Sequence, residues 1–367
     1  VFYRALESRD KQGAIQDHFV KGITRRDLTM WTHSIAEFRS VPLQVVCYWL
    51  PKPVLQRITS LPPLSESGGA ARHGMQTTDD FRFLRLRWEI DDSSQTRWVP
   101  IAKGGEYQPF WEDLTLVVDW APDGYLLKTY LAEKRLRLQG SADWAPWLNH
   151  SEYYFSEGLT YPERTTSDFS PRILPRGAAF SGTGIAIQSV SRERLLAYLG
   201  GAYSRVFKMV TESFVGSGDN AFSGSAAKRY RSGLLNQIPA PLVDADVDTL
   251  NRVIEPASVY WQFASMDETA RTFAGTFTGS GAGLRDVVTE LERWKLEAFS
   301  LVLSHNEAIE RAVVAYYSLT EEDLPVLEDL VGPHPNSYPP LKAARAQDAR
   351  ELYLLNSDTL MEYATGE

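Results

Sequence analysis

Alternating apolar and charged residues indicate strands in the first half of the chain. In Leu84–Ile90, leucine, tryptophan and isoleucine alternate with arginine and glutamate, which is the period of a strand with one buried face and one solvent-facing face. Three later stretches have the same character: Arg97–Ile101, Leu114–Trp120 and Gly158–Gln188, the last with intervening turns. The pattern therefore predicts a sheet-rich region.

Helical spacing of apolar residues interrupts and follows these strands. Gly124–Leu138 and Arg192–Met209 carry apolar residues three and four positions apart among charged ones. Strand blocks mixed with a few helices predict an α+β domain, which we place at residues 68–240. The flexible-loop composition of Ser65–Gly69 indicates where it begins.

Two further regions flank this domain. The pattern of residues 1–67, interrupted by prolines, predicts helices joined by connecting segments. A charged stretch begins at Val1, so we expect residues 1–67 to connect to a missing upstream part. Beyond Pro239-Ala240-Pro241 the spacing is helical almost throughout, as in Leu284, Val287, Val288, Leu291 and Trp294. We therefore expect a mainly helical domain at residues 241–367.

The composition is that of a globular protein, since 43% of the 367 residues are apolar. No run approaches the roughly 18 apolar residues of a membrane span, and the first residues lack a signal-peptide pattern, so we expect a cytoplasmic protein. Cys47 lies in an apolar run and is predicted to pack in a core. The six histidines lack metal-ligand spacing, so we expect no structural metal.

The net charge of -9 hides a strong asymmetry. Residues 161–232 hold ten cationic and five acidic side chains, whereas residues 241–367 hold 22 acidic and nine basic ones. A basic middle and an acidic tail indicate surfaces with different partners. If the basic residues of 161–232 form one concave stripe, they favour DNA binding; if they are dispersed, they favour docking to a protein.

No catalytic constellation is visible. Methylation of an exocyclic amine requires an Asn/Asp-Pro-Pro-aromatic loop, and neither Pro-Pro pair follows a residue of that kind. Phe180–Gly184 and Phe214–Gly218 match the Phe-x-Gly-x-Gly pattern of S-adenosylmethionine loops, but neither opens a βαβ series, so we interpret both as turns. We expect this chain alone to have no enzyme activity and to bind no cofactor.

The loop Arg72–Arg82 has the polar residues that read base edges. Gln76 can bind adenine through two hydrogen bonds, and the hydroxyls of Thr77 and Thr78 suit either a base or a phosphate. Arg72 and Arg82 suit guanine or the DNA backbone. These residues are candidates for DNA contact.

A second set of candidates lies in the basic stretch. We assign four residues beside a predicted strand to base edges: Arg164, Thr165, Thr166 and Ser167. Arg172 and Arg176 follow them. Three cations within a Gly/Ser-rich segment, which allows close backbone approach, are assigned to phosphates: Lys228, Arg229 and Arg231.

Several motifs occur in a fixed order along the chain. A glycine-centred loop leads to Phe-x-Arg, then come a Lys-Gly-Gly-Glu element, an aromatic and glycine-rich entry to a strand pair, and an Ile-Pro-x-Pro turn: Arg72–Ile90, Lys103–Glu106, Tyr153–Phe180 and Leu234–Pro241. This order resembles the C-terminal recognition region of single-polypeptide adenine-N6 DNA methyltransferases, as in type IIG restriction-modification enzymes and BREX-type phage-defence methyltransferases. Asp267–Phe273 is similar to a Glu-Thr-Ser element of the BREX-type branch, although Ala270 departs from it.

The resemblance implies a DNA target-recognition domain followed by a packed helical segment. It also implies an upstream catalytic domain outside this chain, which would bind S-adenosylmethionine and methylate a flipped adenine. Double-stranded DNA, that methyltransferase domain and other defence-system proteins are then the expected partners. We add Lys103 of the Lys-Gly-Gly-Glu element to the candidate DNA contacts.

Two alternatives stay open. The same fold could be a protein-docking module that uses an aromatic surface and an acidic tail, with the aromatic residues Trp88, Trp98, Trp111, Trp120, Trp144 and Trp147. A self-contained enzyme is the third reading, and the missing catalytic constellation argues against it.

Overall fold

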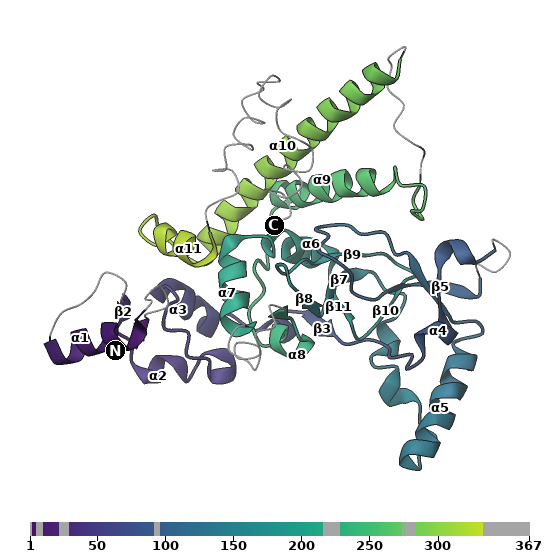
Figure 1. Ribbon diagram of the computed structural model, residues 1–367, viewed down its shortest axis with the longest axis horizontal. Helices are drawn as coiled ribbons and strands as arrows, with labels where there is room; N and C mark the ends of the chain where they lie inside the picture. Colours follow the sequence, from purple (N-terminus) through teal and green to yellow (C-terminus); the bar gives the residue numbers. More distant parts are fainter. Residues whose placement is uncertain are drawn as a thin grey trace. The chain divides into compact units, whose positions relative to one another are not determined.

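The computed structural model describes residues 2–4, 10–21, 29–91, 96–215, 228–273, 275 and 283–332. By its internal contacts the chain divides into two compact units, Val1–Leu61 and Pro62–Glu367. Figure 1 labels most of the helices and strands of both. The further division predicted at residue 240 stays a prediction.

The first unit is mainly helical, as its sequence predicts, but it also contains a strand pair. β1 (Phe2–Arg4) pairs antiparallel with β2 (Thr29–Trp31), and the helices are α1 (Lys11–Lys21), α2 (Ile35–Phe38) and α3 (Lys52–Ser60). Ser34 and Glu37 form a capping box that fixes the start of α2. Cys47 is fully buried, which confirms its predicted place in a core, and burial raises the pKa of its thiol to about 11.

The second unit contains two four-stranded sheets, so the predicted α+β class is confirmed. In the first sheet, β5 and β4 flank β6 in antiparallel fashion and β10 adds parallel to β5: β4 (Leu84–Leu86), β5 (Trp98–Ala102), β6 (Leu116–Asp119) and β10 (Ala179–Phe180). The second sheet is antiparallel, in the order β3 (Gly69–Arg72), β11 (Gly184–Ser189), β7 (Gly158–Pro162) and β9 (Arg172–Leu174).

One predicted strand is shorter than its alternating pattern suggests. β4 ends at Leu86, and Arg87–Glu89 form a 3-10 turn. The carboxylate of Glu89 accepts the Leu86 amide at 2.8 Å, which bends the backbone out of the sheet. Similar 3-10 turns occur elsewhere: Pro42–Gln44, Leu64–Glu66, Ala145–Trp147 and Ser151–Tyr153.

Short elements connect and complete the sheets. α4 (Asp80–Phe83) precedes β4, and β8 (Arg164–Thr165) pairs antiparallel with β12 (Lys228–Arg229). The edge of β3 is satisfied by a side chain, because the Asn236 amide accepts the Ala71 N–H at 2.7 Å and donates to its carbonyl at 2.9 Å. Asn236 follows the short helix α8 (Ser232–Leu235).

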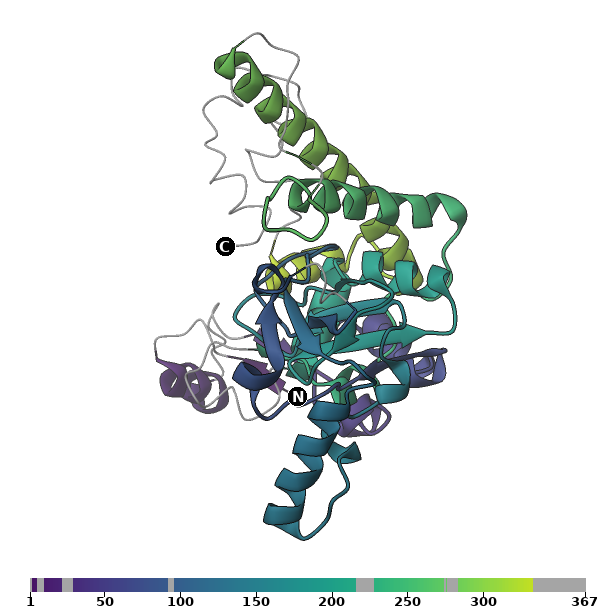
Figure 2. The same ribbon diagram turned by 90° about the vertical axis from the view of Figure 1, so that its right-hand side faces the viewer.

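The helix predicted at Gly124–Leu138 is confirmed as α5 (Tyr125–Gln139). Glycines with positive φ bound it at both ends, Gly124 at 67° and Gly140 at 69°. Leu127 and Leu131 anchor it in the core with Phe83, Val118 and Phe180, while its far end projects away from the sheets (Figures 1 and 2).

A helical layer completes the second unit, and it consists of α6 (Arg192–Gly201), α7 (Arg205–Val215), α9 (Val247–Ala264), α10 (Leu284–Tyr316) and α11 (Leu324–Val331). Figure 2 shows α10 packed against α9. Gly200 of α6 lies so close to Val253 and Ile309 that no Cβ fits. In the part of the chain that the structure describes, no strand follows Arg229, in line with the helical pattern predicted there.

Candidate nucleic-acid interface

An open polar hollow of about 730 Å³ gathers residues from distant segments of the second unit. Five of the sequence-predicted candidates line it: Gln76, Thr77, Thr78, Lys103 and Arg229. The rest of its lining comes from the neighbouring loops: His73, Met75, Asp79, Asp80, Phe81, Leu84, Ile101, Glu163, Ser181, Gly182 and Thr183. We call this surface the polar hollow.

Backbone hydrogen bonds fix the loop that forms one wall of the polar hollow. Met75 donates to the Phe180 carbonyl at 3.0 Å and accepts from the Gly182 amide at 3.0 Å. The backbone amide of Gln76 donates to the backbone carbonyl of Trp147 at 2.7 Å. A Cβ at Gly74 would overlap the carbonyl oxygen of Phe180, so only glycine permits this approach. The side chain of Gln76 is exposed, while these hydrogen bonds hold its backbone in place.

Thr77, Asp80 and Lys103 form a connected chain at the floor of the polar hollow. The Thr77 hydroxyl and the Lys103 ammonium hydrogen-bond to opposite carboxylate oxygens of Asp80. Partial burial acts to raise the pKa of Asp80, but the hydrogen bonds from Lys103 and Thr77 outweigh it and hold that pKa below its usual value. Asp80 is therefore an anion at neutral pH.

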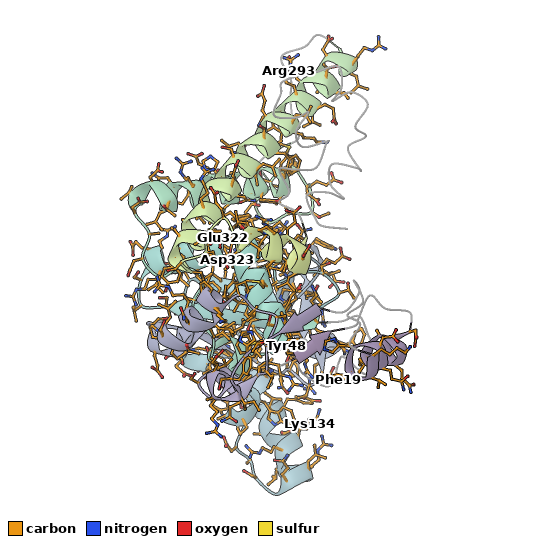
Figure 3. All side chains as sticks on the ribbon, turned by 90° about the vertical axis from the view of Figure 1, so that its left-hand side faces the viewer. Phe19, Tyr48, Lys134, Arg293, Glu322 and Asp323 are labelled. Carbon is orange, nitrogen blue, oxygen red and sulfur yellow. The ribbon has the colours of Figure 1, made fainter. Side chains whose placement is uncertain are left out.

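Thr78 has an unusual conformation for a β-branched residue. Its φ is 58°, in the left-handed region, and its buried hydroxyl makes no hydrogen bond with the described residues. Lys134 of α5, labelled in Figure 3, donates to the Thr78 carbonyl at 3.3 Å and so supports the strained turn. The turn therefore holds the Thr78 hydroxyl inside the loop, away from solvent.

The pairing of β8 with β12 brings two predicted segments together. Arg164 stands opposite Arg229, and Thr165 stands opposite Lys228. Arg229 donates from Nε to Glu163 at 3.2 Å. Arg164, Thr166 and Arg231 are exposed, and the Ser167 amide donates to the Thr165 hydroxyl at 3.0 Å.

Lys228 is held by acidic side chains. Its ammonium lies 2.7 Å from Asp168 and 2.6 Å from Glu212. Asp168 also pairs with Lys208 at 2.7 Å. Burial acts to lower the pKa of Lys228, and the hydrogen bonds from the two carboxylates outweigh it, so that pKa is raised. Lys228 therefore ties β12 to α7 through an ion pair.

Arg172 lies in the interior and not on the surface, with 1% of its side chain exposed. Its guanidinium donates to the carbonyls of Gly104 at 2.6 Å and Glu106 at 3.1 Å, and it forms an ion pair with Glu112. Gly104 has a φ of 86°, which favours glycine at this turn. Arg172 thus holds the loop that carries Lys103 and is not accessible to DNA.

The other predicted arginines lie outside the polar hollow. Arg72 stacks over the Tyr153 ring at 3.8 Å and donates to Gln188 at 3.4 Å. The exposed Arg82 lies 4.8 Å from the centre of the Tyr130 ring. Arg176 is exposed after β9.

The ten basic residues of 161–232 do not form one stripe. Arg172 is interior, Arg205 pairs with Glu310 on α10 at 3.1 Å, and Arg194 donates to the carbonyl of Ser67. Among the ten, only Arg229 lines the polar hollow. This dispersion removes the simplest electrostatic reason for DNA binding and leaves the composition of the polar hollow as the remaining one.

The tryptophans behind the docking alternative are mostly packed. Trp120 is buried, and Trp98, Trp111, Trp144 and Trp147 are partly buried; Trp88 is 52% exposed.

In the described ranges no helix is long and apolar enough to cross a membrane, and no group of three His, Cys, Asp or Glu residues gathers as a metal site would require.

Comparisons with known proteins point to methyltransferases. No family model matches the chain. It is 26% identical over 170 residues to the adenine-specific methyltransferase BrxX of Escherichia coli O9:H4 (strain HS), a match covering 44% of this chain and 13% of that protein. It is 21% identical over 198 residues to the adenine-specific methyltransferase PglX of Lacticaseibacillus casei (strain Zhang), covering 50% of this chain and 16% of that protein. The chain is related to adenine-specific methyltransferases.

The matches span only a minor part of these relatives.

Among solved structures, the type IIL restriction-modification enzyme MmeI in complex with DNA has a TM-score of 0.43 and 16% identity, covering 80% of this chain and 37% of that chain. A TM-score this low does not show a shared fold.

Several residues of the polar hollow were not predicted from the sequence. Phe81 is 95% exposed at its edge although it is a large apolar residue. Its place within the motif Arg72–Ile90 was a signal that could have selected it. Asp80 lies in the same motif, but its pairing with Lys103, 23 residues away, is not visible in the sequence. Glu163 carried no such signal, and the cation it holds lies 66 residues away.

The two glycine motifs have different outcomes. Phe180–Gly184 forms the turn between β10 and β11, as predicted, and a Cβ at Gly184 would overlap the backbone of Ala102. The second motif, Phe214–Gly218, lies partly outside the described residues.

Within Asp267–Phe273, the carbonyls of Thr269 and Ala270 accept from Arg87 at 3.2 and 3.0 Å, so this element packs beside the first sheet.

Proposed function

We propose that this chain binds double-stranded DNA and reads part of its sequence for an adenine-N6 DNA methyltransferase of a restriction-modification or phage-defence system. The supporting observation is that Gln76, Lys103 and Arg229, which are far apart in the chain, line one open hollow. The sequence relationship to two adenine-specific methyltransferases supports the same reading.

The polar hollow offers the two kinds of contact that a duplex requires. Gln76 presents an exposed side-chain amide that can accept from N6 of adenine and donate to N7. Lys103 and Arg229 line the same hollow and supply positive charge. We assign Gln76 to base edges and the two cations to phosphates.

The methyl-transfer chemistry belongs outside this chain in this proposal. S-adenosylmethionine and the amine-holding loop would lie in a catalytic domain of the parent enzyme. The role of the chain is then to hold the duplex in register while the target adenine leaves the stack. In the proposal Lys228 and Arg172 stabilise this fold and do not contact DNA, because carboxylates and carbonyl groups occupy their side chains.

A second candidate function is docking to another protein without DNA contact. The dispersion of the basic residues of 161–232 favours it, since a duplex-binding surface usually concentrates such charge.

Selection of duplexes from a randomised pool by the full chain separates the two functions. Enrichment of one sequence motif supports DNA recognition. Failure to retain any duplex at low salt contradicts it and favours the docking function.

A further inference from the structure

The two cations that line the polar hollow, Lys103 and Arg229, are each paired with a carboxylate, and so is the neighbouring Lys228. Lys103 pairs with Asp80, Arg229 pairs with Glu163 at 3.2 Å, and Lys228 lies between two acids. The pairs differ in the number of carboxylates that hold the cation. Lys103 and Arg229 are each paired with one carboxylate, and one member of each pair faces solvent, since Asp80 is 50% exposed and Arg229 is 44% exposed. Lys228 is held by two carboxylates, so the first two pairs have fewer contacts to break before the cation can meet a ligand.

The carboxylates of the first two pairs, Asp80 and Glu163, are held in place by other contacts. Asp80 is hydrogen-bonded by Thr77 as well as by Lys103. Glu163 is anchored through its backbone, whose carbonyl accepts from Tyr230 at 2.7 Å and whose amide donates to Thr183 at 2.9 Å. Both carboxylates thus occupy the positions beside Lys103 and Arg229 where phosphate oxygens of a bound duplex would otherwise lie.

We propose that Asp80 and Glu163 are internal counter-ions that suppress binding to DNA of the wrong sequence by occupying the phosphate-binding sides of Lys103 and Arg229. This inference rests on the proposed function. Non-specific binding draws almost all of its free energy from cations that displace condensed counter-ions from phosphates. A lysine or arginine that is already neutralised contributes less to that term.

The consequence for cognate DNA is different. When Gln76 meets its base partner, the duplex is held close enough for phosphates to replace the carboxylates, since ion pairs open to solvent on one side are weak. Asp80 and Glu163 therefore act as specificity-determining residues, because they penalise duplexes that offer only phosphates.

The test measures affinity of the full chain for short duplexes of randomised sequence across a salt series. Asp80→Asn and Glu163→Gln keep the shape of each side chain and remove its charge. Each variant is expected to bind more tightly than wild type at low salt, with the slope of log affinity against log salt steeper by about 0.9 for each freed cation. Its advantage should then shrink about threefold when salt rises from about 50 to about 200 mM.

Asp248→Asn is the matched control. Asp248 pairs with Arg252 on α9 at 2.8 Å, outside the polar hollow, so this variant makes the same change in net charge. Its salt slope is expected to equal that of wild type. Adding Lys103→Gln to Asp80→Asn should remove the gain, because no freed cation remains.

The outcomes separate the inference from the proposed function. No binding to any duplex by wild type and all variants overturns both. Binding by wild type together with unchanged or weaker binding by Asp80→Asn and Glu163→Gln overturns the counter-ion role and leaves DNA recognition standing. A gain as large in Asp248→Asn assigns the effect to net charge and also overturns the counter-ion role.

Discussion

The guanidinium of Arg172 donates to the carbonyl oxygen of Gly104 at a distance of 2.6 Å. Residues 68 positions apart are thus joined in the interior, and the residue next to Gly104 is Lys103 of the polar hollow. A buried arginine therefore holds the backbone of the loop that carries the partly exposed Lys103. This relationship makes the fold of the Lys103–Glu106 loop dependent on a buried ion pair.

Arg172→Ala is expected to destabilise the protein by about 3–5 kcal/mol, because it leaves the Glu112 carboxylate buried without its partner. Arg172→Lys should recover only part of this loss, since an ammonium cannot reproduce the planar fork that reaches two carbonyls. Urea unfolding of the three proteins measures the difference. A loss below about 1 kcal/mol for Arg172→Ala would contradict the anchoring role.

Glu112 is expected to make stability depend on pH. Burial raises its pKa to about 7, although Arg172 opposes the shift. Between pH 4.5 and 7 the folded protein therefore binds more protons at this site than the unfolded chain does. The free energy of unfolding should fall as pH rises through that window, by at most about 3 kcal/mol. In Glu112→Gln this part of the pH dependence should be absent. A difference between the two proteins that stays constant from pH 4 to 8 would refute the assignment.

Gln76→Ala and Arg229→Ala should have different effects on DNA binding. Loss of the Gln76 amide is expected to cost about 1–3 kcal/mol on the selected sequence and little on scrambled duplexes. Arg229→Ala should weaken binding to both alike and flatten the salt dependence by about one unit of slope. Gln262→Ala on α9, which removes a glutamine outside the polar hollow, is the control. Equal losses on both duplexes for Gln76→Ala would show that Gln76 does not read a base.

Phe81→Ala should reduce DNA affinity by roughly three- to tenfold without lowering the melting temperature. The ring is 95% exposed, so its removal creates no cavity, yet it lies where it can pack against a thymine methyl group or a base edge. Val190→Ala removes another exposed apolar side chain away from the polar hollow and should leave affinity unchanged. Comparable affinity losses for the two variants would argue against a contact by Phe81.

Gly74→Ala is expected to destabilise the protein by about 1–3 kcal/mol and to displace Gln76, because the new methyl group would overlap the Phe180 carbonyl. Gly233→Ala is the matched control. It lies in α8 with no atom within 4 Å of the added Cβ, so its stability should stay the same or rise slightly. Thermal unfolding of both variants checks the difference, and equal melting temperatures would contradict the close approach at Gly74.

Features that depend on near neighbours could be predicted from the sequence alone. The spacing of leucines predicted α5 to within a residue at either end, and the glycine motif at Phe180–Gly184 was correctly interpreted as a turn. Helix periodicity and turn formation arise from residues a few positions apart, so a linear pattern contains them. β4 is the exception, since the Glu89 side chain ended an alternation that favoured a longer strand.

Which charged residues are available for binding depends on the folded structure and could not be predicted from the sequence. In the sequence Arg172, Lys228 and Arg229 are three similar cations of one basic stretch. In the fold the first is interior, the second lies between two acids, and the third opens into the polar hollow. Their partners lie 16 to 68 residues away in the chain. The state of a charge depends on burial and on the nearest opposite charge, and both are set by long-range packing that local pattern does not record.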